Sequence, residues 1–234
     1  MGTTQEWNTA HRAYEISHDQ FTKRELRPSE LEVNMQGEVI LVPTDSKARL
    51  ENEFYTLRYL HQNTTIPVPT PLGLTTEDGI TTLTTARVNG NAVALSDYDG
   101  RDRQAVLEKV ERELATDIIP ALQQLTSRRM GAMNQDEQLL LPPRITDYAG
   151  RGWPRCTSKD TTFVLVHNDL GQANIFIDSD THRILAIIDW EYSGFYPQQF
   201  EAPLWRYHPR EQDWDAHRPA DLCHLLDEIQ RSSE

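Results

Sequence analysis

The sequence predicts an α+β fold of two lobes that share a cleft: a small β-rich N-terminal lobe and a larger, helical C-terminal lobe. Its length of 234 residues fits one substantial domain or two small lobes. Short runs of β-branched residues prevail in the N-terminal part, whereas a long apolar stripe of helical period opens the C-terminal part. After that stripe comes a β-hairpin with polar residues at its ends.

The N-terminal part has the pattern of a small sheet with one helix laid on it. The first residues are polar and charged, so we expect the ordered chain to open near Phe21. Two short β-rich runs flank a segment containing Asn and Gly, which favours a hairpin turn, and apolar residues at helical spacing follow them. The predicted elements are strands at residues 31–33 and 38–42, a helix at residues 46–62 with Ser46 as its N-cap, and a strand at residues 80–88.

The C-terminal part begins with the longest predicted helix. Apolar residues from Val106 to Leu125 recur with a period of 3.6, and Pro120 predicts a kink in this helix. A connector rich in Pro and Gly follows, and after it the pattern changes to short apolar runs separated by turn residues. We expect a loop at residues 135–158 and strands at residues 162–166, 174–178 and 183–188.

Composition excludes several classes of function. Thirty-six acidic and 23 basic side chains give a net charge of −13, which would repel nucleic acids and anionic membranes but leaves cationic or neutral partners open. Two cysteines cannot support a disulfide scaffold. The apolar runs are far shorter than the roughly 20 residues that span a bilayer, and the N-terminus does not resemble a signal peptide. We therefore expect a cytoplasmic protein; its oligomeric state stays open.

Polar residues at the ends of the predicted strands carry the chemistry. Asp169 follows a buried strand, Asn174 opens the next strand, and Asp189 ends the antiparallel partner of that strand. The hairpin folds Asn174 against Asp189, so that an amide oxygen and a carboxylate meet at one end of the sheet. Such oxygens are ligands for Mg²⁺. Asp169 beside this metal could accept the proton of an attacking hydroxyl, which is the arrangement that phosphoryl transfer needs.

These residues also resemble a known family. His167-Asn168-Asp169-Leu170, with Asn174 and a downstream Ile-Ile-Asp-Trp-Glu, is similar to the aminoglycoside phosphotransferase/choline kinase-like group of the protein-kinase-like fold. Catalytic loops in that group read His-Gly-Asp-Leu-x-x-x-Asn. The phrase that runs from Asp189 to Pro197 resembles the fungal "phosphotransferase enzyme family" branch.

The resemblance implies an ATP- and Mg²⁺-dependent kinase that phosphorylates a hydroxyl of a small molecule. It places Asp169 at the catalytic-base position, Asn174 and Asp189 at the Mg²⁺ ligands, and His167 at a residue that braces the loop. It also implies a trimmed nucleotide-binding lobe at residues 1–88 and, at residues 89–234, a lobe with the catalytic loop, the metal site and the acceptor region.

The nucleotide lobe departs from the family in two ways. It has no Gly-rich phosphate loop, and Val42 occupies the place expected for the strand lysine that pairs with a helix glutamate, here Glu53. Lys47, at the start of the helix, is the nearest substitute. By resemblance, backbone groups of Ala86 and Val88 face the adenine.

The acceptor region is the acidic, aromatic-rich chain after Asp189. The resemblance makes Glu191, Trp205 and Tyr207 candidate substrate contacts, and acidic plus aromatic side chains suit a cationic acceptor. The alternative is a solvated acidic tail whose aromatic residues serve packing.

A second class of function is also open. The missing strand lysine and glycine loop are compatible with a pseudokinase-like binding protein, or with a family member recruited to a non-phosphorylating biosynthetic step.

Overall fold

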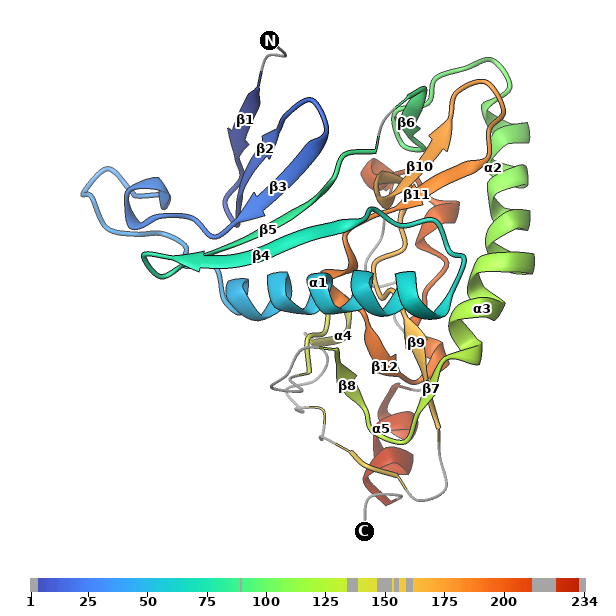
Figure 1. The fold of residues 1–234 in the computed structure, drawn as a ribbon. Coiled ribbons are helices and arrows are strands. Elements are labelled where there is room, and N and C mark those ends of the chain that lie inside the picture. The colour runs from blue at the N-terminus through green and yellow to red at the C-terminus, as the bar shows by residue number, and fades with distance from the viewer. Residues whose placement is uncertain are drawn as a thin grey trace.

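The computed structural model describes residues 4–88, 90–133, 139–146, 153, 156–158, 162–211 and 222–231. Much of the predicted connector at 135–158, and part of the acidic stretch before the last helix, lie outside these residues. The described chain forms the two-lobed α+β fold, with one five-stranded sheet and two smaller sheets. The N-terminal sheet and the helix beneath it make one lobe, and the remaining elements make the other (Figure 1).

The N-terminal lobe is an antiparallel sheet of order β1-β2-β3-β5-β4 backed by helix α1. Strand β5 alternates between buried and partly exposed residues, and it contacts the face of α1 that buries Leu50, Leu57 and Leu60. The elements are β1 (Gln5–Asn8), β2 (Ala13–Ile16), β3 (Gln20–Arg24), α1 (Ser46–Asn63), β4 (Pro71–Glu77) and β5 (Ile80–Ala86).

Three predictions about this lobe are wrong in detail. The ordered chain begins with β1 rather than near Phe21; all four side chains of β1 are exposed, so the apolar alternation that marks a strand is absent. Residues 31–33 and 38–42 form no strands: one bridge joins Val33 to Val39, and these apolar side chains stay exposed because no sheet covers them. Ser46 is the first helical residue, and the N-cap is Asp45.

The predicted long helix is present but has a wide turn in the middle. Its segments are α2 (Arg103–Glu113), a π-helical turn (Leu114–Ile118) and α3 (Ile119–Gln124). Pro120 has no backbone N–H to donate within a helix. The π-helical turn lies just before Pro120, at the position predicted for the kink. The apolar stripe is buried along its length, as at Val110 and Leu122.

Two small antiparallel sheets complete the C-terminal lobe, and the predicted hairpin is confirmed. One sheet has the order β11-β10-β6 and contains that hairpin, with Ile175 opposite Ile187. The other sheet has the order β7-β9-β12-β8. Among the described residues, no helix is long and apolar enough to cross a membrane. The elements are β6 (Ala92–Ala94), β7 (Thr126–Ser127), β8 (Gly131–Ala132), α4 (Pro143–Thr146), β9 (Phe163–Val166), β10 (Ile175–Asp178), β11 (Ile184–Ile187), β12 (Gly194–Tyr196) and α5 (Leu222–Arg231), with 3-10 turns at Pro28–Glu30, Gln172–Asn174, Trp190–Tyr192, Gln198–Phe200, Leu204–Arg206 and Pro209–Glu211.

Candidate active site

The β10–β11 hairpin brings Asn174 and Asp189 to one end of its sheet. Asn174 closes the 3-10 turn before β10, and Asp189 follows β11 after Ile188. The backbone N–H of Ile188 donates to the carbonyl of Asn174 at 2.9 Å. Asp189 then adopts a left-handed backbone, φ 66°, which turns the chain out of the strand. Non-glycine residues in this conformation are often found at functional sites.

His167 ties the loop after β9 to the same hairpin. Its side chain is buried; Nδ1 accepts the backbone N–H of Asp169 at 3.2 Å, and Nε2 donates to the carbonyl of Ile188 at 2.9 Å. One ring nitrogen accepts and the other donates, so the ring is neutral. Burial lowers the pKa of His167 to about 4, in agreement with that state. The residue therefore orients the loop that carries Asp169.

Asp169 lies on this loop and is partly exposed. The Nδ2 group of Asn174 donates to the carbonyl of Asp169 at 2.8 Å and to its Oδ2 at 3.2 Å. Burial raises the pKa of Asp169 to about 7, and the charge of Asp189 acts in the same direction. A carboxyl group with a pKa near 7 is well matched to accept a proton at neutral pH.

Asn168 stands where the loops of the resembling family have glycine. Its φ of 69° is left-handed, a conformation that asparagine tolerates better than most residues. Its Nδ2 donates to the carbonyl of Tyr192 at 3.0 Å, and the buried Arg144 of α4 donates to its carbonyl at 2.8 Å. These hydrogen bonds support the left-handed backbone at Asn168, a conformation that glycine adopts without such support. Arg144 lies in the predicted connector, where no pattern marks it.

Lys23 of β3 supplies the buried ion pair of the N-terminal lobe. Its Nζ lies 3.0 and 2.8 Å from the carboxylate oxygens of Glu53 and 2.6 Å from Oδ1 of Asp189. Burial alone would lower the pKa of Lys23, but the charges of Asp189 and Glu53 outweigh it and raise the pKa. Burial would likewise raise the pKa of Asp189, and the Lys23 ammonium holds it below its usual value. Burial raises the pKa of Glu53 to about 7.

The prediction that Val42 replaces the strand lysine, with Lys47 as the nearest substitute for pairing with Glu53, is therefore wrong. Lys47 has an exposed side chain and lies 3.7 Å from Glu51 of its own helix. Residues 38–42 form no strand, so Val42 has no place in the sheet. The lysine instead comes from β3, where Lys23 lies opposite Leu83 of β5. Phe21 and Lys23 lie two residues apart, as side chains on one face of a strand do, and this was the available signal, but it is short.

Helix α1 is fixed against the chain just after Asp189. Asn52 donates to the carbonyls of Glu191 and Ser193 at 3.0 and 2.8 Å, and the hydroxyls of Thr56 and Ser193 are 2.7 Å apart. These bonds flank Glu53 along the helix, so they place its carboxylate within reach of Lys23 and Asp189.

Glu191 lies in this ion cluster. Its Oε2 accepts Nη2 of Arg12 at 2.8 Å, and its Oε1 lies 3.5 Å from Nη1 of Arg49. Arg12 follows the turn between β1 and β2, in the segment where no order was predicted. The side chain of Glu191 thus contacts the N-terminal lobe, while its predicted contact with an acceptor stays a prediction.

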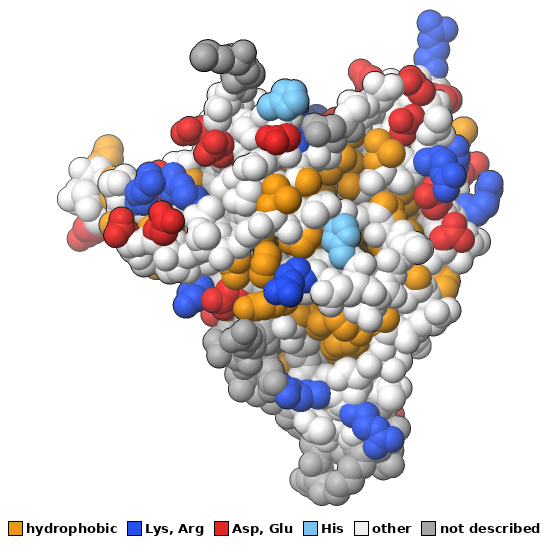
Figure 2. All heavy atoms as spheres, viewed as in Figure 1, with side chains coloured by type: hydrophobic (Ala, Val, Ile, Leu, Met, Phe, Trp, Pro, Cys, Tyr) orange, Lys and Arg blue, Asp and Glu red, His pale blue; other side chains and the backbone are white. Residues whose placement is uncertain are grey.

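A cavity of about 200 Å³ opens beside the ion cluster, and it contains two of the predicted nucleotide contacts. Ala86 and Val88 line it together with Lys23 and Glu53. Ile16, Phe21, Phe176 and Ile188 are among its apolar lining residues, from both lobes. Hydrophobic side chains gather in the middle of the face shown in Figure 2, and most charged ones lie towards its edges. The apolar lining of the cavity suits a flat ring.

The two predicted aromatic acceptor contacts differ in position. Trp205 is joined to the catalytic loop, because its carbonyl accepts Nε2 of the buried Gln172 at 2.9 Å. Arg103 holds Gln172 from the other side, at 2.8 Å. Tyr207 is exposed. The structure therefore places Trp205 in contact with the loop, and it places the side chain of Tyr207 at the surface.

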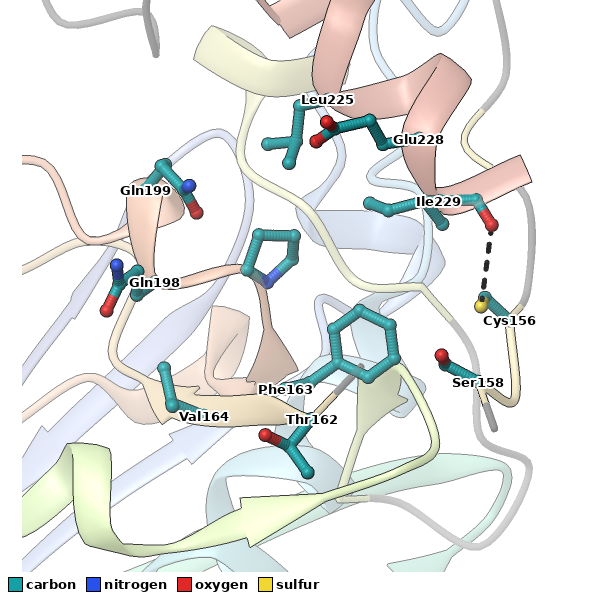
Figure 3. Close-up of a pocket in the computed structure, with 11 residues that line it drawn as sticks. Cys156, Ser158, Thr162, Phe163, Val164, Gln198, Gln199, Leu225, Glu228 and Ile229 are labelled. Carbon is teal, nitrogen blue, oxygen red and sulfur yellow. Dashed lines mark hydrogen bonds between the residues drawn. The ribbon is translucent and has the colours of Figure 1, made fainter. Parts of the chain in front are cut away.

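A larger cavity, of about 390 Å³, lies away from this site. It is formed by β9, the turn at Gln198–Phe200 and α5, and Sγ of Cys156 lies 3.9 Å from the carbonyl of Ile229 at its edge (Figure 3). Asp169, Asp189 and Lys23 do not line it. Size alone therefore does not identify the functional site.

The oxygens at the hairpin end fit a hard divalent cation. The side-chain hydrogen bonds of Asn174 to described residues use Nδ2, which leaves its amide oxygen as a possible ligand. Carboxylate oxygens of Glu53, Asp189 and Glu191 lie within 4.8 Å of one another. Mg²⁺ takes one or two such protein oxygens and completes its shell with phosphates and water. Asn174 and Asp189 would hold it, and Lys23 would then share Asp189 with the metal.

The sequence model of the phosphotransferase enzyme family matches residues 38–213, which is more than half of the chain. The chain belongs to this family. The matched stretch begins after β3, so that Arg12 and Lys23 of this phosphotransferase-family chain lie outside it. No curated protein matches the chain.

Solved structures of aminoglycoside phosphotransferases show the same protein-kinase-like fold. APH(3'')-Id from Streptomyces rimosus is 18% identical, with 97% of this chain and 83% of that chain covered and a TM-score of 0.58. A mutant of aminoglycoside 2'-phosphotransferase-IIIa in complex with GDP is 14% identical, with 97% and 83% covered and a TM-score of 0.53. A thermostable mutant of APH(4)-Ia is 14% identical, with 98% and 78% covered and a TM-score of 0.52. The predicted fungal branch stays a prediction.

Proposed function

We propose that this chain transfers a phosphoryl group from a magnesium-bound nucleoside triphosphate, ATP or GTP, to a hydroxyl of a small molecule. The observation that carries the proposal is the Lys23–Asp189 contact of 2.6 Å, because it joins a cation of the N-terminal lobe to a carboxylate of the catalytic hairpin. The cavity lined by Ala86 and Val88 would take the base. The net charge of −13 favours a cationic acceptor.

In this proposal the acceptor oxygen forms a bond to the γ-phosphorus while the bond from that phosphorus to the bridging oxygen breaks. The hydroxyl proton passes to the carboxylate of Asp169, and the nucleoside diphosphate leaves. Bound magnesium would neutralise charge on the phosphates. His167 and Asn174 hold the Asp169 loop in position, and Lys23 supplies positive charge beside the phosphates.

The alternative of a catalytically degenerate binding protein rested on two departures from the family. Lys23 removes the first, because a strand lysine is present and paired with Glu53. The second, the lack of a glycine-rich loop, remains. We therefore favour an enzyme.

The test is a titration of the purified chain with MgATP and MgGTP, followed by a search for the phosphorylated product by mass spectrometry. The acceptors would include aminoglycosides and other hydroxylated amines. Slow hydrolysis of the nucleotide gives a readout that needs no acceptor. We expect hydrolysis that stops on chelation of magnesium and in Asp189→Asn. A chain that binds neither nucleotide, or hydrolyses them equally well without Asp189, contradicts the proposal.

A further inference from the structure

The turn between β1 and β2 has no glycine, and contacts within the turn occupy the backbone N–H groups of Thr9, His11 and Arg12. The N–H of Thr9 donates to the carbonyl of Arg12 at 2.8 Å. The N–H groups of His11 and Arg12 both donate to Oγ1 of Thr9, at 3.3 and 3.2 Å. Backbone amides that are bonded within a turn cannot also bind an anion. A side chain is therefore the better source of positive charge for the phosphates at this turn.

Arg12 points inward from the end of this turn. It is only 2% exposed, and Nη1 donates to the carbonyl and the hydroxyl of Ser46 at 3.0 and 2.7 Å. Its Nη2 donates to Glu191, two residues after Asp189. The positive charge of Arg12 also helps to lower the pKa of Asp189. The guanidinium is thus paired with a carboxylate two residues along the chain from the one proposed to hold magnesium.

The position of Arg12 just before β2 also suits a phosphate contact. Ile16, the last residue of β2, lines the cavity proposed for the base. Four residues of extended chain separate the two positions by about 13 Å. A nucleotide whose base lies at Ile16 and whose phosphates run along β2 would therefore extend towards Arg12.

Glu191 can release Arg12 without becoming an unpaired buried carboxylate. Arg49 lies on its other oxygen, and Arg49 is itself held by the hydroxyl of Tyr192 and lies over that ring, 5.3 Å from its centroid. By contrast, Lys23 cannot leave Glu53 without leaving that buried carboxylate unpaired, which is unfavourable. Among these three cations, Arg12 is carried by a turn, whereas the other two are carried by a helix and a central strand.

We propose that Arg12 binds the terminal phosphates of the nucleotide, and so takes the place of the amides of a glycine-rich turn. This inference rests on the proposed function. In the structure Arg12 is paired with Glu191, and it would exchange that carboxylate for the phosphates when the nucleotide binds. Arginine suits this role because its planar fork can bind two phosphate oxygens at once.

The test compares two ligands, the magnesium triphosphate and its nucleoside, by calorimetric titration of the full chain. Arg12→Met keeps the length and packing of the stem but removes the charge. We expect it to weaken triphosphate binding by about 10- to 100-fold and to leave nucleoside binding unchanged, as for the loss of a charged hydrogen bond. Arg12→Lys is expected to recover part of the loss. The exposed Arg101 provides a matched control, Arg101→Met, with no expected change.

Each outcome decides the matter. Unchanged triphosphate binding in Arg12→Met overturns the inference. Tighter triphosphate binding in this variant also overturns it, because it would mean that Arg12 blocks the nucleotide site. If Arg12→Met fails to fold, Arg12→Met/Glu191→Gln removes the opposite charge too, and the same ratio between the two ligands is measured. A wild-type chain that binds neither ligand overturns the proposed function and this inference together. Wild-type binding that does not depend on Arg12 overturns this inference alone.

Discussion

The catalytic loop and the ion cluster of the N-terminal lobe meet at Asp189 but are held by different contacts. On the loop, His167 and Asn174 hold Asp169 through hydrogen bonds to the backbone and between neighbours in the chain. In the cluster, Lys23 and Arg12 reach carboxylates from distant segments through side-chain ion pairs. Near pH 7 the His167 ring of the loop is neutral, because burial lowers its pKa to about 4, whereas the cluster carries the charged Lys23–Asp189 pair.

Because of this difference, we expect the catalytic loop to determine the proton chemistry and the ion cluster to contribute to the stability of the fold. A loop residue replaced by a group of the same shape keeps most of its hydrogen bonds and changes the proton chemistry. A neutral residue in place of Lys23 leaves buried carboxylates without their shared cation, which destabilises the fold. We therefore expect substitutions on the two sides of Asp189 to have opposite signatures: lost turnover in a stable protein on one side, and lost stability on the other.

Asp169→Asn gives the largest expected effect on turnover. Asparagine has the same shape and can still accept from Nδ2 of Asn174 through its oxygen, but it cannot take a proton. Loss of a general base lowers turnover by about 10²- to 10⁴-fold. We expect unchanged affinity for the magnesium nucleotide and a similar midpoint of unfolding. The measurement is nucleotide hydrolysis, or transfer once an acceptor is known. Turnover equal to that of the wild type would remove Asp169 from the proposed mechanism.

Lys23→Met gives the largest expected effect on stability. It leaves the carboxylates of Glu53 and Asp189 close together without their shared cation, and breaking a buried ion pair in this way costs about 3–5 kcal/mol of unfolding free energy. Urea denaturation measures the loss. Lys23→Met/Glu53→Gln removes one of the stranded charges and is expected to recover part of it. If the double variant is no more stable than the single one, the cluster does not act as a charge-balanced unit.

The same contrast explains which parts of the site could be predicted. Asp169, Asn174 and Asp189 lie on one loop and one hairpin, so their spacing along the chain determines which of them become neighbours. The hairpin itself formed as its pattern predicts. In such a segment, local sequence is enough to infer local geometry.

The N-terminal lobe could not be predicted in this way, because its pairs are long-range. Lys23 meets Glu53 from 30 residues away and Arg12 meets Glu191 from 179 residues away, so no local spacing relates them. The apolar run at residues 38–42 has a high strand propensity but finds no partner strand. The polar β1 has a low propensity and is nevertheless paired along its length with β2. Sheet pairing, rather than residue type, decided both cases.

The buried carboxyl group of Glu201, which contacts the catalytic loop, is expected to make the stability of the fold depend on pH. It accepts the backbone N–H of His167 through Oε2, and its Oε1 has no hydrogen-bond partner among the described residues. Burial raises the pKa of Glu201 to about 7. The unfolded chain releases this proton near pH 4, whereas the folded chain keeps it until about pH 7. Stability from this group is therefore complete below pH 4 and is lost as the pH rises through 7.

Glu201→Gln keeps the acceptor for His167 and removes the titration. We expect the variant and the wild type to be similarly stable at pH 4. At pH 8 the variant is expected to be more stable, by up to about 3 kcal/mol. Urea denaturation at several pH values measures the difference between the two proteins, which isolates Glu201 from Asp169 and Glu53. A difference that does not change with pH would show that Glu201 is ionised in the folded protein.

Lys47→Ala gives the smallest expected effect, and it tests a lysine that lies outside the ion cluster. Lys47 was the sequence-based candidate for the phosphate cation, yet its side chain is 60% exposed and pairs with Glu51 one helical turn away. An exposed pair of this kind contributes about 0.3–0.5 kcal/mol, because water and salt screen it. We expect a stability change within that range and no change in affinity for the magnesium nucleotide, where Lys23→Met is expected to lower both. A loss of nucleotide affinity in Lys47→Ala would mean that the cation for the phosphates comes from the start of α1 and not from β3.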